Sequence, residues 1–343
     1  MRYFYKTFIF LFLIAFLSSC GDDVPFHKNI TGKAGEVLFV VSDNTWKGEV
    51  GKAIKDIFMS PQVSLPQEEP LFNVAQIPNK AFNSLLETHR NIVLVEISSS
   101  VDSASVTYID DKWAYPQAVI SIKASSSESF LEVLHRNSDK MVSRFLKAER
   151  NRLQINYRKQ ADQGLIKKIK DKFNISLVIP HGFKIGINKK DFMWIRYDAG
   201  DITQGLFIYS FPYKSDSTFT ANYVLNKRDS LLKDNVEGPT EGSYMTTERR
   251  ATPFMNIFRY KNNYSFELRG LWRVENDFMG GPYVNLSVLD ASKSRVIVLD
   301  GFVYAPKFKK RNYLRQMEAI IYSLKLPDQA ANDKINSQIN MGN

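Results

Sequence analysis

The apolar positions in the first half of the chain alternate between short strand-like runs and segments with helical periodicity. Strands are predicted where β-branched runs lie between turn residues, at 35–42, 71–77, 92–97 and 119–123. Helices are predicted between them, at 46–59 and 80–88. A capping box of Ser125 and Glu128 opens a long amphipathic helix that runs to Leu153. Because strands and helices alternate, this half should form a mixed α/β sheet.

From residue 174 onward the pattern is dominated by strands. They are predicted at 176–179, 183–187, 192–197, 202–211, 254–260, 264–274, 284–289 and 295–304. Helices are predicted at 165–173, 223–232 and 311–324, where apolar residues share one helical face. The predicted fold class is therefore α/β followed by α+β, with one sheet-based domain in each half.

The chain divides into five predicted segments. Residues 1–19 are interpreted as a lipoprotein signal peptide and residues 20–34 as a tether. Residues 35–160 form the N-terminal α/β domain, which includes the long amphipathic helix, and residues 161–327 form the C-terminal α+β domain. The polar residues 328–343 are predicted to be a disordered tail.

The amino terminus carries the most specific chemical signal. Arg2 and Lys6 precede an apolar stretch at 8–17, which is typical of a signal peptide, since a spanning helix needs about 20 residues. The sequence Leu17-Ser18-Ser19-Cys20 then resembles a bacterial lipobox, and Cys20 is the only cysteine. A cysteine thiolate is nucleophilic enough to take a diacylglycerol as a thioether. We therefore predict that Cys20 is lipidated and that its acyl chains, such as palmitate, anchor the protein in a membrane, which is its expected partner.

The residues after Cys20 bear on location. Asp22 and Asp23 resemble the export signal of Bacteroidota lipoproteins, which directs them to the outer membrane. A lipid-anchored outer-membrane location in the cell envelope is therefore expected. Two positions stay open, the periplasmic face and the cell surface.

Positive charge is concentrated in two parts of the chain, residues 139–172 and a second cluster of Lys307, Lys309, Lys310, Arg311 and Arg315. The sequence has 46 basic and 36 acidic residues, and 44% of its residues are hydrophobic, as in a globular protein. Residues 139–172 alone contain eleven Lys or Arg against four Asp or Glu. This cluster has two interpretations: a solvated helix face, or attraction to anionic headgroups at about 1 kcal/mol per charge. No nucleic-acid partner is expected, because no aromatic-interleaved binding motif accompanies the cluster.

Several short segments resemble a family of uncharacterised Bacteroidota lipoproteins, domain of unknown function 4837. They are LPQEEPLFNV (65–74), HRNI (89–92), RDS (228–230), RGLW (269–272), MGGPY (279–283) and GFVYAP (301–306). The resemblance covers nearly the whole mature chain and implies a location and a lineage. It implies no activity, so it transfers no catalytic residue. The second domain, with strands first and a packed helix last, is also similar to Mog1/PsbP-like α/β/α sandwiches.

Known catalytic and cofactor motifs are missing from the sequence. The histidines His27, His89, His135 and His181 are far apart, and no HExxH, Walker A, GxGxxG or GxSxG motif occurs. An SxxK at Ser230 and an SDN at 42–44 stand in reversed order without KTG, so we interpret both as chance. We expect no metal, no cofactor and no catalytic residue.

One region suggests a ligand site. Arg269 and Trp272 could supply an anion clamp and a stacking face, close to Gly280, Gly281 and Tyr283. The alternative is a tight loop before a strand, with Trp272 in the core and Arg269 in an ion pair.

Two hypotheses for function follow. The first is a non-enzymatic, lipid-anchored envelope protein that binds a partner, an envelope protein or a glycan, through its second domain. The second is an envelope hydrolase that acts on glycan or peptidoglycan with Glu275 and Asp277 as its acids. Glycoside hydrolysis needs two carboxyls about 5–10 Å apart across a cleft. The orientation of Glu275 and Asp277 therefore discriminates between the two.

Overall fold

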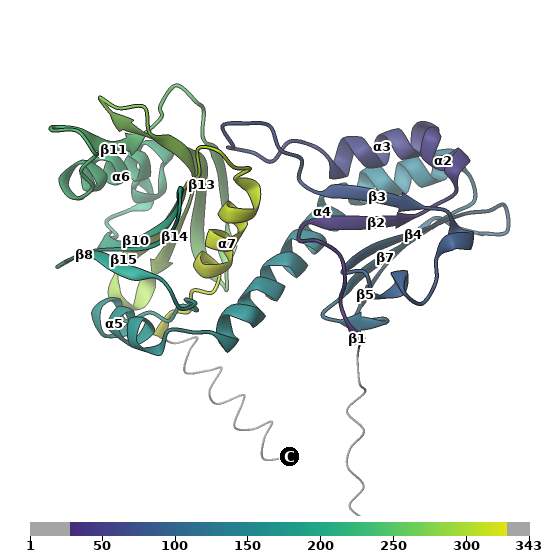
Figure 1. Ribbon diagram of the computed structural model, residues 1–343, viewed down its shortest axis with the longest axis horizontal. Coiled ribbons are helices and arrows are strands. Elements are labelled where there is room, and N and C mark those ends of the chain that lie inside the picture. The colour runs from purple at the N-terminus through teal and green to yellow at the C-terminus, as the bar shows by residue number, and fades with distance from the viewer. Residues whose placement is uncertain (1–27, 328–343) are drawn as a thin grey trace, which may run out of the picture.

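Two β-sheets, each packed against helices, organise residues 28–327, which are the residues that the computed structural model describes (Figure 1). The signal peptide, Cys20 and the tail 328–343 lie outside these described residues. Residues 28–34 of the predicted tether are bound to the N-terminal domain. There β1 (Lys28–Asn29) pairs with β6 (Ala114–Tyr115), and the Thr31 amide donates to the Thr88 carbonyl.

The N-terminal sheet has five strands in the order β3-β2-β4-β7-β5. They are β2 (Glu36–Val40), β3 (Asn73–Ile77), β4 (Asn91–Ile97), β5 (Ser105–Asp110) and β7 (Ala118–Ala124). All pairings are parallel except β5 with β7, so the sheet is mixed, as predicted. On one face α3 (Glu49–Phe58) and α4 (Ser127–Lys159) bury a cluster centred on Phe39, Phe58 and Phe145. The short α2 (Asp43–Lys47) precedes α3.

Several sequence predictions in this domain need correction. The predicted helix at 80–88 is wrong: the structure has two 3₁₀ turns, η1 (Asn79–Ala81) and η2 (Leu86–Thr88). Between them the Asn83 side chain accepts from the Leu85 and Leu86 amides, which satisfies the backbone without a helix. The capping box of α4 is Ser126 with Ser129, one residue later than predicted. Strand β5 was not predicted; it is an edge strand with no fully buried residue.

The C-terminal sheet is antiparallel throughout, in the order β11-β13-β14-β15-β10-β9-β8, and β12 also pairs with β13. Its strands are β8 (Lys184–Lys189), β9 (Phe192–Ala199), β10 (Ile202–Pro212), β11 (Tyr244–Thr247), β12 (Phe254–Tyr260), β13 (Asn263–Glu275), β14 (Gly280–Asp290) and β15 (Arg295–Tyr304). The predicted strand at 176–179 is instead an extended segment whose Ser176 bridges to Lys325.

Helices cover both faces of this sheet. On one face α5 (Gln163–Phe173) and α7 (Arg311–Ile321) pack on alternate residues of β14 and β15, such as Leu286 and Leu299. On the other face α6 (Ala221–Asn235) packs with the short turn η3 (Asp216–Phe219) over an aromatic cluster. The turn η4 (Ala291–Lys293) joins β14 to β15. The domain is therefore an α/β/α sandwich, and the chain has the two sheet-based domains predicted.

The two domains meet where α4 runs beside α7 (Figure 1). Glu69, from the 65–74 segment, is 5% exposed, and its carboxylate accepts the amides of Lys310 and Arg311 at the start of α7. Arg315 donates to the Leu71 carbonyl at 2.6 Å, and Gln154 of α4 donates to the Ala319 carbonyl at 2.9 Å. The Glu69 contact caps a helix that carries no side-chain cap of its own.

Candidate functional site

Arg269 and Trp272 lie on opposite faces of the C-terminal sheet. They are three residues apart on β13, and successive side chains of a strand point to opposite faces. Arg269 faces α7, where its Nε donates to Glu267 at 2.8 Å and its Nη1 donates to Glu318 at 2.5 Å. Trp272 faces the α6 side, and its indole N–H donates to the Val303 carbonyl at 3.2 Å. The two side chains therefore do not form a common clamp and stacking face.

Gly280, Gly281 and Tyr283 are held within the sheet by close packing. A Cβ placed on Gly281 would lie 2.1 Å from the Val303 carbonyl oxygen, so only glycine fits between β14 and β15. A Cβ on Gly280 would lie 2.9 Å from the Trp272 carbonyl oxygen. Tyr283 is 0% exposed, and burial, the largest effect, raises the pKa of its hydroxyl to about 12. Protein atoms pack tightly against these three residues, so the predicted ligand has no space beside them.

The two carboxylates of the hydrolase hypothesis are engaged locally. Glu275 accepts from Arg273 at 2.5 Å, and Asp277 accepts from the Met279 amide at 3.1 Å. Within residues 28–327 the structure contains no group of three or more His, Cys, Asp or Glu side chains that could hold a metal ion.

Trp272 does reach a pocket, with different neighbours from those predicted. An aromatic pocket of about 300 Å³ opens between the sheet and the turn after α6, and Trp272 and Met279 line it with Trp194 and Phe302. The arginine at this pocket is Arg196, whose guanidinium lies 5.4 Å from the Trp194 ring centroid and pairs with Asp198 at 2.6 Å. This pocket is smaller than the cavity between the domains.

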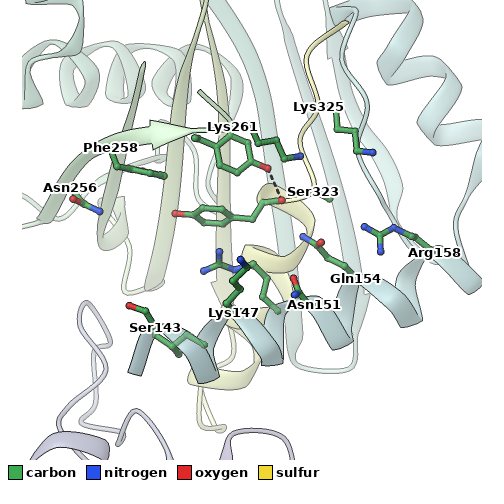
Figure 2. A pocket seen from close by; sticks show the side chains of 14 residues that line it. Ser143, Lys147, Asn151, Gln154, Arg158, Asn256, Phe258, Lys261, Ser323 and Lys325 are labelled. Atoms are coloured by element: carbon green, nitrogen blue, oxygen red, sulfur yellow. Dashed lines mark hydrogen bonds between the residues drawn. The ribbon is translucent and has the colours of Figure 1, made fainter. Parts of the chain in front are cut away.

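A larger cavity, the interdomain cleft, lies between α4 and the C-terminal domain (Figure 2). Its volume is about 660 Å³, within the range of small-molecule sites. Residues of α4 form one wall, and β12 with the segment after α7 forms the other (Figure 2). Five basic side chains line it, three from α4 and two from the facing wall: Lys147, Arg150, Arg158, Lys261 and Lys325. Among the described residues the lining contains no carboxylate.

The floor of the interdomain cleft is aromatic and rigidly held. The Arg150 guanidinium lies 3.9 Å from the centroid of the Tyr322 ring, a cation–π contact. The Tyr260 hydroxyl donates to the Tyr322 carbonyl at 2.6 Å, and Lys261 donates to the Leu324 carbonyl at 2.7 Å. These contacts fix the segment after α7 against β12. Within the described chain the buried Nε of Arg150 has no hydrogen-bond partner.

Buried charges behind the floor hold Tyr322 in place. Its hydroxyl donates to Glu267, which also accepts from Arg269 at 2.8 Å. Burial, the largest single effect, raises the pKa of Glu267, but Arg269, the Tyr322 hydroxyl and Arg150 together outweigh it, so the pKa is lowered and the side chain stays anionic. Burial raises the pKa of the Tyr322 hydroxyl, with Glu267 as a further cause, so this hydroxyl remains a donor. Arg269 therefore lies behind the floor of the cleft, where it pairs with Glu267, and it is not one of the residues that line the cleft.

The sequence pattern predicted the basic residues of one wall but did not predict a cleft. Lys147, Arg150 and Arg158 belong to the basic cluster at 139–172, which was interpreted chiefly as a solvated face. The facing wall comes from residues more than a hundred positions later in the chain, so no local pattern could have placed it there.

The comparisons with known proteins match both domains. Residues 162–323 match the model of the family described as a domain of unknown function, DUF4837. Residues 31–158 match a second domain of unknown function, DUF8532, and this match includes the segments at 65–74 and 89–92. One wall of the interdomain cleft, on α4, therefore lies in the part of the chain that matches DUF8532, and β12 of the facing wall lies in the part that matches DUF4837.

Solved structures show only distant similarity to the chain. A mutant of the protein Mog1 matches with 9% identity and a TM-score of 0.31, over 46% of this chain and 93% of Mog1. The human StarD13 lipid transfer and protein localization domain matches with 12% identity and a TM-score of 0.22, over 47% of this chain and 95% of that one. A Bacteroides thetaiotaomicron structure matches with 10% identity and a TM-score of 0.20, over 44% of each chain. A search of curated proteins finds no match.

Proposed function

We propose that this protein is a lipid-anchored protein of the cell envelope that binds an anionic ligand in the interdomain cleft. The observation that carries the proposal is the lining of the cleft, five basic side chains with no carboxylate. Such a lining repels cations and attracts phosphate or carboxylate groups, because the field of like charges is focused inside a cleft.

The chemistry of the cleft favours a ligand that combines negative charge with a ring. Arg150 and Arg158 can donate charge-assisted hydrogen bonds to phosphate or carboxylate oxygens. Phe258 and Tyr322 offer aromatic surface to a sugar ring. Envelope glycans and lipid headgroups that bear phosphate or carboxylate groups have both features. The ligand class is therefore an anionic glycan or headgroup.

The hydrolase alternative has less support. Glycoside hydrolysis needs two facing carboxyls, and the fourteen residues that line the interdomain cleft include none. Glu275 and Asp277 line neither this cleft nor the aromatic pocket. We therefore favour binding without catalysis.

The envelope location rests on the amino terminus. The lipobox with Cys20 and the acidic residues after it support an anchor in the outer membrane, on either face. None of the helices within residues 28–327 is long and apolar enough to cross a bilayer. Replacing Cys20 with Ser should release the protein from membranes washed with high salt. If the Cys20→Ser variant still sediments with the membrane fraction, the lipid anchor is refuted.

Isothermal titration calorimetry tests the binding proposal. Inorganic pyrophosphate and a glucuronate-containing oligosaccharide serve as probes, since one carries phosphate alone and the other carboxylate on a ring. The test variant is Arg150→Ala with Arg158→Ala. The matched control is Lys168→Ala with Lys170→Ala, which removes the same charge from exposed positions on α5 outside the cleft.

The cleft variant should lose at least about tenfold in affinity, since a hydrogen bond to a charged group contributes about 1.5–3 kcal/mol. The α5 control variant should bind nearly as the native protein does. Equal losses in the two variants would mean that binding follows net charge alone and would refute a site in the cleft.

A further inference from the structure

A second, smaller cavity lies between the domains, on the side of α4 near the start of the N-terminal sheet. It has a volume of about 80 Å³, and Arg90 and Arg152 of the N-terminal domain face Arg315 of α7 across it. Glu149 is the only acidic residue in its lining. We call this the arginine cavity. Its lining carries three positive charges against one negative charge.

The negative charge of Glu149 is already engaged by the N-terminal domain. Its carboxylate accepts from Arg152 at 2.8 Å and from the Asn91 amide at 2.8 Å, and it lies 3.4 Å from the Nε of Arg90. Arg152 gives its other donors to the carbonyls of Pro116 and Arg90. The Glu149 carboxylate therefore already pairs with two guanidiniums, those of Arg90 and Arg152, and both belong to the N-terminal domain.

Arg315 forms no direct ion pair in the described chain, although the carboxylates of Glu318 and Glu149 act on it at longer range. It is 7% exposed, it forms no ion pair within residues 28–327, and its Nη2 donates only to the Leu71 carbonyl and the Gln62 amide oxygen. Its Nε and Nη1 are buried and have no hydrogen-bond partner in the described chain, and neither has the Nε of Arg90. A buried charge is normally paired, because leaving it unpaired is strongly unfavourable.

The surroundings of Arg315 keep it charged and keep space beside it open. Burial, the largest effect, lowers the pKa of Arg315 to about 10, so the guanidinium is still protonated at neutral pH. Gly35 lines the same cavity with a φ of +72°, and a Cβ there would lie 3.0 Å from the Nη1 of Arg315. Glycine at this position keeps a side chain out of the space beside the guanidinium.

We propose that the arginine cavity binds a small inorganic anion, chloride or phosphate, which joins the two domains. Such an anion gives Arg315 a direct ion pair and accepts from its Nε and Nη1 donors, which lack partners in the described chain. The cavity is large enough, because one water needs only about 10–15 Å³ of such volume. Water alone could meet the donors but would leave Arg315 without a direct ion pair. This site is separate from the interdomain cleft, shares no lining residue with it, and does not depend on the proposed function.

Anomalous diffraction from crystals of the intact protein in bromide tests the site directly. Bromide replaces chloride and scatters anomalously, and a parallel crystal in phosphate distinguishes the two ions. We expect a peak in the arginine cavity within hydrogen-bond distance of Arg315, in bromide if the ion is a halide and in phosphate if it is an oxyanion. A cavity that holds only water, or nothing, in both crystals overturns the proposal.

Thermal unfolding in solution gives an independent readout. At constant ionic strength, replacing gluconate with chloride or phosphate should raise the Tm by about 3 °C or more once the anion is tenfold above its Kd. Arg315→Met should abolish this rise, and the exposed control Arg250→Met should keep it. If Arg315→Met does not fold, Arg315→Lys, which keeps the charge but loses the fork of donors, should reduce the rise. An undiminished rise in the Arg315 variant that folds would refute the site.

Discussion

Replacing Arg228 with Met should destabilise the C-terminal domain more than a typical core substitution. Arg228 and Asp300 are both 0% exposed and form two parallel hydrogen bonds, at 2.8 and 3.2 Å. Arg228 also donates to Thr247 at 2.9 Å and lies 3.8 Å from the centroid of the Tyr283 ring. Met fills part of the volume but leaves the Asp300 carboxylate buried without its counter-charge. Removing one partner of a buried pair costs about 3–5 kcal/mol, and we expect a loss in that range.

Urea unfolding monitored by circular dichroism measures this loss, and hydrogen exchange in β15 assigns it to the C-terminal domain. The double variant Arg228→Met with Asp300→Leu is the control, because an apolar pair of similar volume often matches or exceeds a buried ion pair in stability. It should recover much of the stability lost by Arg228→Met alone. A single-variant loss below about 1 kcal/mol, or a double variant no better than the single one, would refute the reasoning.

Three further predictions concern the domain interface, the sheet and the buried charges. Glu69→Ala leaves the buried amides at the start of α7 unpaired, so urea unfolding should show a loss of about 1–3 kcal/mol. Gly281→Ala places a methyl group against the Val303 carbonyl, so the free energy of unfolding should fall by about 1–3 kcal/mol, which a lower Tm would show. The pKa of Glu267 is below its ordinary 4.5 in the folded protein, so its stabilisation is complete above that pH and is lost as pH falls through the folded pKa. The urea midpoint should therefore drop as the pH is lowered below 4.5, and it should drop less in Glu267→Gln; equal slopes would contradict this assignment.

Most elements of the fold could be predicted from the sequence, because their apolar residues recur with a regular period. The long helix and the strands at 92–97 and 295–304 are examples. The pattern failed where side chains bond locally: at 80–88, the Asn83 side chain satisfies backbone amides and two 3₁₀ turns form instead of a helix. It also missed β5, an edge strand that alternates between exposed and partly buried residues and has no fully buried one.

The candidate site was harder to predict, because it depends on which face a side chain takes and on distant contacts. Arg269 and Trp272 are close in sequence, but the strand period separates them across the sheet. Arg150 and Tyr322 are far apart in sequence, yet they are in contact at the floor of the cleft. The packing of α4 against α7 brings them together, and Gln154 of α4 donates to the Ala319 carbonyl of α7 there.

A crystal structure of the intact protein with pyrophosphate would show whether the interdomain cleft binds an anionic group. We expect phosphate density in the cleft, within hydrogen-bond distance of Arg150 or Arg158 and beside the ring of Tyr322. An empty cleft at saturating pyrophosphate, or phosphate bound only at exposed lysines elsewhere, would contradict it.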